Sequence, residues 1–264
     1  MNTLKRKYGP AALVTGASSG IGRAFAEELA ARDFDLVLVA RRGGRLEQIK
    51  NDLEARFGIS VMPIVQDLTA SGAVRRVCEE IQKSGWDIGL LINNAGFGSQ
   101  GEFDTLDLEN ELTMVDLACR VPVELTHRLV PGMKQRRRGG IIFVSSVLSQ
   151  FPSPYMATYA AGKSFEFSFS NSLHGEWKAY GIDVLALLPG TTDTEFFQVA
   201  QSQRRISMPK ADPRAVARTA LRALGKKPFV VHGWSNKVSV FMSRYLLTRW
   251  LIGLVRWYMK PRSR

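Results

Sequence analysis

Residues 12–32 read ALVTGASSGIGRAFAEELAAR and pass from an apolar run through a glycine-rich turn into an amphipathic segment. The run Ala12–Thr15 has the length and composition of a buried strand, and Arg23–Arg32 has the apolar spacing of a helix. Glycine at positions 16, 20 and 22 lets the backbone turn tightly and approach a ligand closely. The helix N-terminus behind the turn offers free N–H groups to a pyrophosphate. The stretch therefore predicts a strand–loop–helix unit that binds a dinucleotide.

Strand-like runs return along the chain and alternate with segments of helical period. They are Leu36–Ala40, Val61–Val65, Ile88–Ile92, Ile141–Val144, Val184–Leu188 and Phe229–Val231. Runs this short and apolar are typical of parallel strands buried on both faces. We expect one α/β domain over residues 1–233, with a doubly wound sheet of about seven parallel strands and helices on both faces. Residues 234–264 are expected to add a helical extension rich in basic and aromatic residues.

Composition narrows the class of protein further. With 264 residues, 45% hydrophobic and 23% charged, the chain is typical of a globular protein. Cys78 and Cys119 stand outside any CxxC pattern, so we expect free thiols and a cytoplasmic location. The N-terminus lacks the features of a signal peptide. The three histidines are far apart in sequence, and no metal site is expected.

The net charge of +12 is concentrated in the last quarter of the chain. Residues 204–264 contain fifteen Lys or Arg and a single acid, Asp212. Such asymmetry indicates an acidic partner, either an anionic lipid surface at the inner face of a membrane or a phosphate-bearing substrate. Specific nucleic-acid binding is not expected, because no recognition motif accompanies the charge.

Unusual residues follow six of the predicted strands. They are Thr15-Gly16, Arg41-Arg42, Asp67, the run Asn93-Asn94-Ala95-Gly96, Ser145-Ser146 and Pro189-Gly190. Ligands of doubly wound sheets bind beyond the carboxyl ends of the strands, so these residues are expected to share one crevice. Arginine after the second strand, where an NAD site carries an acid, accommodates the 2′-phosphate of NADP(H). We expect Arg41 to make that contact and Arg42 to assist.

The stretch ATYAAGK places Tyr159 four residues before Lys163, on one face of a helix. A nearby ammonium favours the phenolate, so Lys163 is expected to lower the pKa of Tyr159 towards the range useful for proton transfer. Ser146, at the end of a strand, could hydrogen-bond a carbonyl as charge develops on it. The alternative is a packed aromatic beside a surface lysine.

TGASSGIG, NNAG, a serine thirteen residues before a tyrosine, YAAGK and LLPGTTDT together resemble the short-chain dehydrogenase/reductase family. The match covers roughly residues 10–200. The residues around the motifs are similar to those of a bacterial branch of ketoacyl-reductase-like oxidoreductases. The resemblance implies a Rossmann-type fold, a nicotinamide cofactor and interconversion of a carbonyl and a secondary alcohol. It makes Ser146, Tyr159 and Lys163 catalytic residues.

The resemblance also assigns binding residues. Those expected at the cofactor are Gly16, Ser18, Ser19, Gly20, Ile21, Gly22, Arg41, Arg42, Asp67, Asn93, Ala95, Gly96, Tyr159, Lys163, Pro189, Gly190, Thr192 and Thr194. Those expected at an apolar substrate pocket are Tyr155, Phe196 and Phe197, the last two within a lid over residues 195–211. For Tyr155 a purely structural role is the alternative, and for Thr194 a helix cap.

One position departs from the family pattern. By spacing to Ser146, Ala118 stands where the family has an asparagine whose backbone carbonyl holds a water and whose amide supports a helix distortion. Alanine keeps the carbonyl and loses the amide, so reduced turnover is expected. Asp116, two positions away, should point elsewhere.

Residues 238–264 read VSVFMSRYLLTRWLIGLVRWYMKPRSR, too interrupted by arginine for a membrane span. The segment could lie in a membrane interface, pack on the core or on a second copy in a homodimer or homotetramer, or guide a lipid-like substrate. The sequence thus favours an NADP(H)-dependent reductase of an apolar ketone or 3-oxoacyl substrate. The alternative is a nucleotide-binding regulatory or interaction protein with weakened catalysis.

Overall fold

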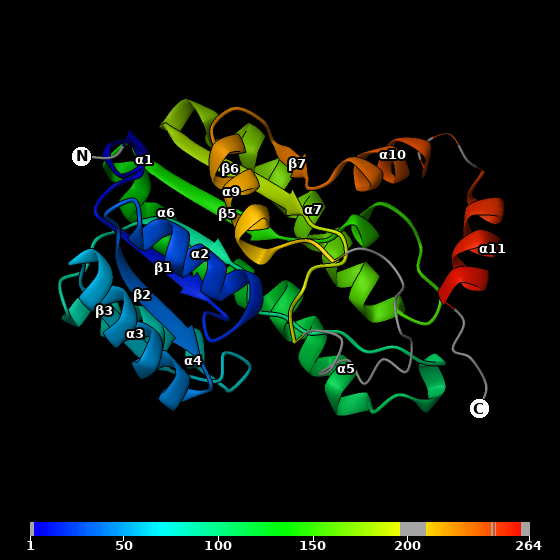
Figure 1. The fold of residues 1–264 in the computed structure, drawn as a ribbon, viewed down its shortest axis with the longest axis horizontal. Coiled ribbons are helices and arrows are strands. Elements are labelled where there is room, and N and C mark those ends of the chain that lie inside the picture. Colours follow the sequence, from blue (N-terminus) through cyan, green and yellow to red (C-terminus); the bar gives the residue numbers. More distant parts are fainter. Residues whose placement is uncertain (1–2, 196–209, 244, 246, 260–264) are drawn as a thin grey trace.

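The computed structural model describes residues 3–195, 210–243, 245 and 247–259. A single sheet of seven parallel strands forms its central layer, in the order β3-β2-β1-β4-β5-β6-β7 (Figure 1). The strands are β1 (Ala11–Thr15), β2 (Asp35–Ala40), β3 (Val61–Val65), β4 (Ile88–Asn93), β5 (Gly139–Val144), β6 (Ile182–Leu188) and β7 (Phe229–Val231). The order reverses between β1 and β4, which leaves a crevice beyond the carboxyl ends of these strands. The predicted Rossmann-type sheet is confirmed.

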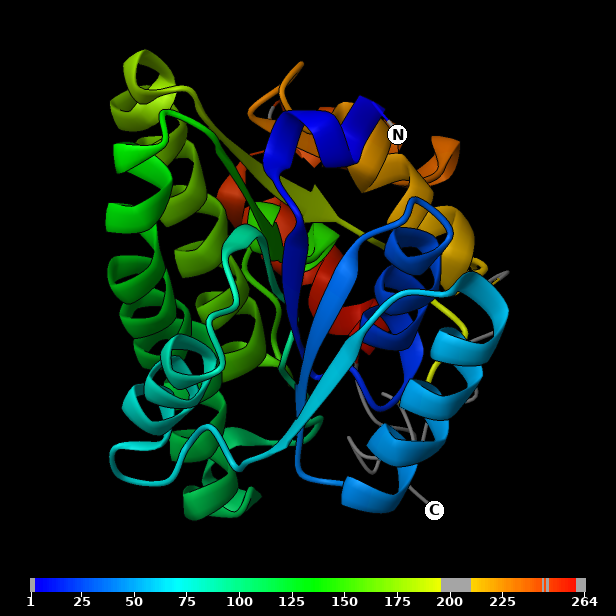
Figure 2. The same cartoon turned by 90° about the vertical axis from the view of Figure 1, so that its left-hand side faces the viewer.

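Helices cover both faces of the sheet (Figure 2). The helices are α1 (Thr3–Tyr8), α2 (Gly20–Ala30), α3 (Gly43–Phe57), α4 (Ala73–Lys83), α5 (Leu108–Val115), α6 (Val121–Gln135), α7 (Ala157–Trp177), α9 (Pro213–Ala223), α10 (Trp234–Ser243) and α11 (Thr248–Met259). Four short turns join them: η1 (Phe103–Thr105), η2 (Asp116–Arg120), η3 (Val147–Gln150) and η4 (Lys178–Tyr180). Helices α2, α3 and α9 pack on one face, and α4, α6 and α7 pack on the other.

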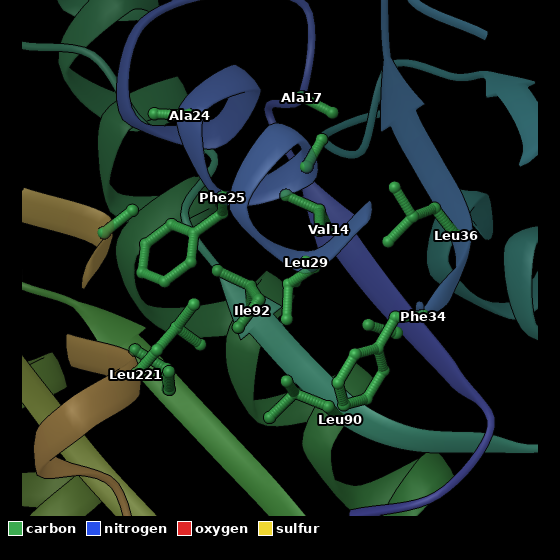
Figure 3. Packing of buried hydrophobic residues seen from close by; sticks show 14 of the residues in the cluster. Val14, Ala17, Ala24, Phe25, Leu29, Phe34, Leu36, Leu90, Ile92 and Leu221 are labelled. Atoms are coloured by element: carbon green, nitrogen blue, oxygen red, sulfur yellow. The ribbon is translucent and has the colours of Figure 1, made fainter. Parts of the chain in front are cut away.

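Alternation of side chains along the strands gives each helix layer its own core. Ala12 and Val14 of β1 join the cluster under α2, where Phe25 lies near Leu221 of α9 (Figure 3). Leu13, between them in sequence, joins the cluster under α4 and α6. Every residue of β1 is buried, as the continuous apolar runs predict for parallel strands. The sheet is therefore packed against a helix layer on both faces.

The predicted strands match the observed ones to within two residues at either end. The largest differences are at β5, which begins at Gly139 rather than Ile141, and at β6, which begins at Ile182 rather than Val184. Gly139 and Gly140 belong to the strand because they pair with Ile182 and Asp183 of β6. Glycine is required at both positions because neighbouring side chains leave no room for a Cβ. An added Cβ would lie 2.7 Å from Met133 at position 139 and 2.9 Å from Leu90 at position 140.

Helices α10 and α11 follow β7 and stand apart from the two helix layers (Figure 1). Leu251 and Val255 of α11 are buried, whereas Trp250 and Trp257 are 65% and 78% exposed. Among the helices of the described residues, none combines the length and apolar character that crossing a membrane requires. The extension is helical, as expected, and it turns one face inward and one outward.

Candidate active site

A cavity of about 810 Å³ lies beyond the carboxyl ends of the strands. Its walls include residues that follow β1, β2, β3, β4, β5 and β6, and residues of α10 and α11. The predicted residues on its walls are Gly16, Ser18, Ser19, Gly20, Ile21, Arg41, Arg42, Asp67, Ala95, Gly96, Ser146, Tyr159, Lys163, Pro189, Gly190, Thr192 and Thr194. The topology thus gathers in one place the strand ends that the sequence singled out.

The glycine loop opens α2 at one end of this cavity. Gly16 and Gly20 have φ of 65° and 56°, in the left-handed region that glycine adopts without strain. Gly22 does not line the cavity, because it faces the loop itself. A Cβ at Gly22 would lie 2.3 Å from the Gly16 carbonyl oxygen. Gly22 therefore shapes the loop through close packing, and its expected direct contact with a ligand has no support in the structure.

Two neighbouring asparagines at the end of β4 have different positions. Asn93 is buried, and its Nδ2 donates to Thr126 Oγ1 of α6 at 3.3 Å. Asn94 lines the cavity, and its Nδ2 donates to the Thr15 carbonyl at 2.8 Å. Asn93, expected at the cofactor, is not among the residues that line the cavity, whereas Asn94 is. Adjacent strand residues point to opposite faces, so a shift of one residue exchanges the two roles.

Arg42 is directed towards the glycine loop. Its guanidinium donates to Ser18 Oγ at 3.0 and 3.1 Å and to Ser19 Oγ at 2.7 Å. It also pairs with Glu195 at 2.6 Å, as does Arg45. Arg41 is more exposed and lies 3.8 Å from Asp67. Both arginines line the cavity. Arg42, which was expected only to assist Arg41 in binding the 2′-phosphate, is the one that is hydrogen-bonded to serines of the glycine loop.

These pairs also shift the ionisation of the acids. The hydrogen bonds from Arg42 and Arg45 lower the pKa of Glu195 to about 2. A carboxylate therefore occupies the arginine cluster, and a phosphate group would compete with it. The pKa of Asp67 is also lowered, because hydrogen bonds from Thr69 and the charge of Arg41 outweigh its partial burial.

Ser146, Tyr159 and Lys163 meet on the β5 side of the cavity. Ser146 lies two residues after the end of β5 and is the N-cap of η3, where its Oγ accepts a hydrogen bond from Leu148 N at 3.2 Å. The Tyr159 hydroxyl is hydrogen-bonded to Ser146, and the Lys163 ammonium lies 5.9 Å from the centre of the tyrosine ring. The three residues come from two elements, and the packing of α7 on η3 and β5 brings them together.

The pKa of Tyr159 differs from the expectation. Burial raises it above its ordinary value, although Lys163 and the hydrogen bond from Ser146 act to lower it. Glu166 raises it further. The predicted influence of Lys163 on the phenol is present, but the net shift of the Tyr159 pKa is upward. The carboxylate one turn further along α7 offsets part of the effect of the ammonium.

Glu166 is a residue that the sequence analysis missed. It is 3% exposed, and its two carboxylate oxygens accept from Lys163 Nζ at 3.0 and 2.9 Å. The third hydrogen bond of this ammonium goes to the Val144 carbonyl at 2.8 Å. Burial raises the pKa of Glu166 to about 7, against the lowering influence of Lys163. The spacing Lys163–Glu166, three residues on a helix, was the available signal.

Ala118 lies within η2, which is a π-helical turn between α5 and α6. The helix distortion is therefore present without an amide side chain at this position. Ala118 packs closely on α7, since a Cβ added at Gly162 would lie 2.7 Å from the Ala118 Cβ. Asp116 pairs instead with Arg120 at 2.8 Å and points elsewhere, as expected.

The apolar end of the cavity is built differently from the prediction. Tyr155 is not among its lining residues; it has φ of 67°, and its carbonyl accepts from Gly101 N at 3.0 Å. The next residue, Met156, lines the cavity instead. Phe196, Phe197 and the rest of the predicted lid up to residue 209 lie outside the described residues. Further apolar walls that the sequence analysis did not assign are Phe97, Phe151, Met242, Leu251, Leu254 and Val255.

Comparison with known proteins identifies relatives of the whole chain. Residues 10–205 match the model of a family described as short chain dehydrogenase. A very-long-chain 3-oxoacyl-CoA reductase of Anas platyrhynchos is 31% identical, over 84% of this chain and 73% of that protein. An inactive hydroxysteroid dehydrogenase-like protein 1 of Pongo abelii is 30% identical, over 94% of this chain and 75% of that protein. A short-chain dehydrogenase from Sphingobium yanoikuyae, solved with NADPH, has a TM-score of 0.79 and 30% identity, covering 89% and 93% of the two chains.

Proposed function

The chain belongs to the short-chain dehydrogenase family, whose members are oxidoreductases that bind a nicotinamide cofactor. We propose that it is an NADPH-dependent reductase of apolar ketones or 3-oxoacyl compounds. The observation that carries this proposal is the meeting of Ser146, Tyr159 and Lys163 beside a glycine loop in one cavity. The similarity to a 3-oxoacyl-CoA reductase supports the substrate class.

The residues present fit an NADP-type cofactor. Gly16 and Gly20 leave the loop without side chains where a pyrophosphate would approach, and the α2 N-terminus is free to donate to it. Arg41 and Arg42 would hold the 2′-phosphate, in competition with Glu195. Asp67, Ala95 and Gly96 would adjoin the adenosine, and Pro189, Gly190, Thr192 and Thr194 the nicotinamide. The NADPH complex of the Sphingobium relative supports this choice of cofactor.

When bound, the cofactor would supply a hydride to the carbonyl carbon of the substrate. Ser146 and Tyr159 would orient the carbonyl oxygen through their hydroxyls. As that oxygen gains negative charge, Tyr159 would transfer its phenolic proton to it. The ketone thereby gains one hydride and one proton and leaves as an alcohol, and Tyr159 regains a proton from solvent. Lys163 would stabilise the transient phenolate through its positive charge.

The apolar walls favour a bulky or acyl-chain substrate. Met242, Leu251, Leu254 and Val255 place part of the C-terminal extension at the cavity. Burial of each additional methylene contributes about 0.8 kcal/mol, so affinity should rise with chain length until the cavity is filled.

The outer face of the extension supports a second part of the proposal, contact with an anionic membrane surface. Phe241, Tyr245 and Trp250 are each more than half exposed and do not line the cavity. The surrounding quarter of the chain has a large excess of basic residues. Apolar and aromatic side chains together with basic charge are typical of segments that lie in a lipid interface. A second copy of this chain in a homodimer or homotetramer is the alternative occupant of the same face.

Vesicle sedimentation separates these two occupants. Binding to phosphatidylserine vesicles at low salt that is lost at high salt and in Tyr245→Ser/Trp250→Ser supports contact with a membrane. A dimer or tetramer in solution that the same double substitution dissociates, with no vesicle binding, supports a second copy of the chain and removes the membrane part of the proposal.

The competing function is a nucleotide-binding protein without turnover, which the relative named inactive and Ala118 favour. A panel of ketones and 3-oxoacyl thioesters of graded chain length, assayed with NADPH and with NADH, tests the two functions. We expect NADPH-dependent reduction that improves with chain length. NADPH binding without reduction of any member would favour the competing function.

A further inference from the structure

The Lys163 ammonium makes three hydrogen bonds within the protein. An ammonium has three N–H groups, and those of Lys163 reach the Val144 carbonyl and the two oxygens of Glu166. Both side chains of the pair are buried, at 6% and 3% exposure. A buried carboxylate in this position is a strong local charge, because little water screens it. The proposed mechanism assigns a role to Lys163 and leaves Glu166 unused.

We propose that Glu166 is a positioning residue for the reaction, a carboxylate that holds the Lys163 ammonium and offsets its charge at Tyr159. This inference rests on the proposed reductase function. With Glu166 ionised, the phenol keeps its proton to a more alkaline pH than Lys163 alone would allow. Ketone reduction requires the protonated phenol, so Glu166 extends the pH range over which the reductive reaction proceeds.

Few other ionisable groups of the described residues face this pair. Tyr159 and Lys163 belong to the same helix as Glu166, and Cys119 approaches both members of the pair from η2. Cys119 is a free thiol whose pKa is raised by burial and by Glu166, so it is neutral near pH 7. Glu166 is thus the counter-charge of Lys163 in the described part of the site.

The same geometry relates Glu166 to Ala118. The close contact of Ala118 with Gly162 sets η2 against the segment of α7 that carries Lys163. No amide at position 118 can assist in orienting the lysine. Glu166 performs that orientation from within α7, through two hydrogen bonds to the lysine ammonium.

The test compares the wild type with Glu166→Gln, which keeps the shape and one acceptor and removes the charge, and with Glu166→Asp, which withdraws the charge by one methylene. Glu176→Gln is the matched control, because Glu176 is an exposed acid on the same helix. NADPH dissociation constants and thermal unfolding, both measured first, establish that each variant folds and binds.

The main measurement is the pH profile of kcat/KM for ketone reduction. Its alkaline limb should move down by about one pH unit in Glu166→Gln and by less in Glu166→Asp. Glu176→Gln should leave the limb in place. Loss of activity at all pH values with no movement of the limb would indicate a merely structural role and overturn the proposal. If Glu166→Gln does not fold, the Asp variant decides by the same criterion.

A second measurement needs no turnover. Ultraviolet titration of tyrosinate, taken as the difference between each protein and its Tyr159→Phe partner, follows the ionisation of Tyr159 directly. Tyr159 should ionise at lower pH in Glu166→Gln than in the wild type, and no earlier ionisation would overturn the proposal. If no ketone is reduced by the wild type, the proposed function fails, and this titration still decides the role of Glu166.

Discussion

The two ends of the cavity are built on different principles. At the cofactor end, the loop after β1 is fixed by backbone contacts so close that Gly22 has no room for a side chain. At the substrate end, α10 and α11 contribute separate apolar side chains and leave large aromatics exposed. The glycine loop of the cofactor end therefore tolerates little change, because an added Cβ at Gly22 would collide with the backbone. The substrate end can change side chain by side chain and so adapt to different molecules.

The largest effect on the cofactor end is expected from Gly22→Ala. A methyl group 2.3 Å from the Gly16 carbonyl forces the loop to move, at a cost on the order of 3 kcal/mol. We expect a lower free energy of unfolding and loss of NADPH binding, measured by denaturant titration and fluorescence. Gly44→Ala is the control, since nothing lies within 4 Å of its added Cβ, and it should be neutral or slightly stabilising. Equal tolerance of both changes would contradict the comparison.

Arg42→Ala removes a side chain of the cofactor end without moving the loop. Loss of a charge-assisted contact to the 2′-phosphate should raise the KM for NADPH about 10- to 100-fold and leave that for NADH nearly unchanged. Arg45→Ala also removes one of the two arginine partners of Glu195, but Arg45 does not bond the loop serines, and this variant serves as the control. If the ratio of NADPH to NADH efficiency is the same in Arg42→Ala as in the wild type, Arg42 does not bind the phosphate.

Glu195→Gln should have the opposite effect on NADPH binding from Arg42→Ala. Its carboxylate, whose pKa the arginines lower to about 2, competes with a phosphate for Arg42. Removal of its charge should tighten NADPH binding several-fold and leave NADH binding unchanged. Calorimetric titration with both cofactors measures this, and weaker NADPH binding would show that Glu195 assists rather than competes.

The smallest effects are expected at the substrate end. Leu251→Ala removes a buried wall and should raise the KM for long-chain ketones, while short ketones are little affected. Trp250→Ala, on the exposed face of the same helix, should change the free energy of unfolding by less than about 0.5 kcal/mol. A larger rise in the KM for long-chain ketones in Trp250→Ala than in Leu251→Ala would contradict this description of the substrate end.

The sequence predicted the parts of the molecule that depend on local pattern. Strands, the glycine loop and the position of Tyr159 beside Lys163 follow from periodicity and spacing. It could not assign Asn94 in place of Asn93, because a strand register decides which of two neighbours enters the cavity. It did not foresee the ion pair of Arg42 with Glu195, which joins residues 153 positions apart. The burial of Glu166 follows from tertiary packing, and a helix-surface pair of the same spacing would be weak.

The most direct test of the account is the rate of ketone-dependent NADPH oxidation in the wild type and in Tyr159→Phe, with NADPH binding measured in both. Loss of the phenolic proton should lower kcat by about 10²- to 10⁴-fold while the NADPH dissociation constant changes little. Equal turnover by the two proteins would contradict the assignment of Tyr159 as the proton donor.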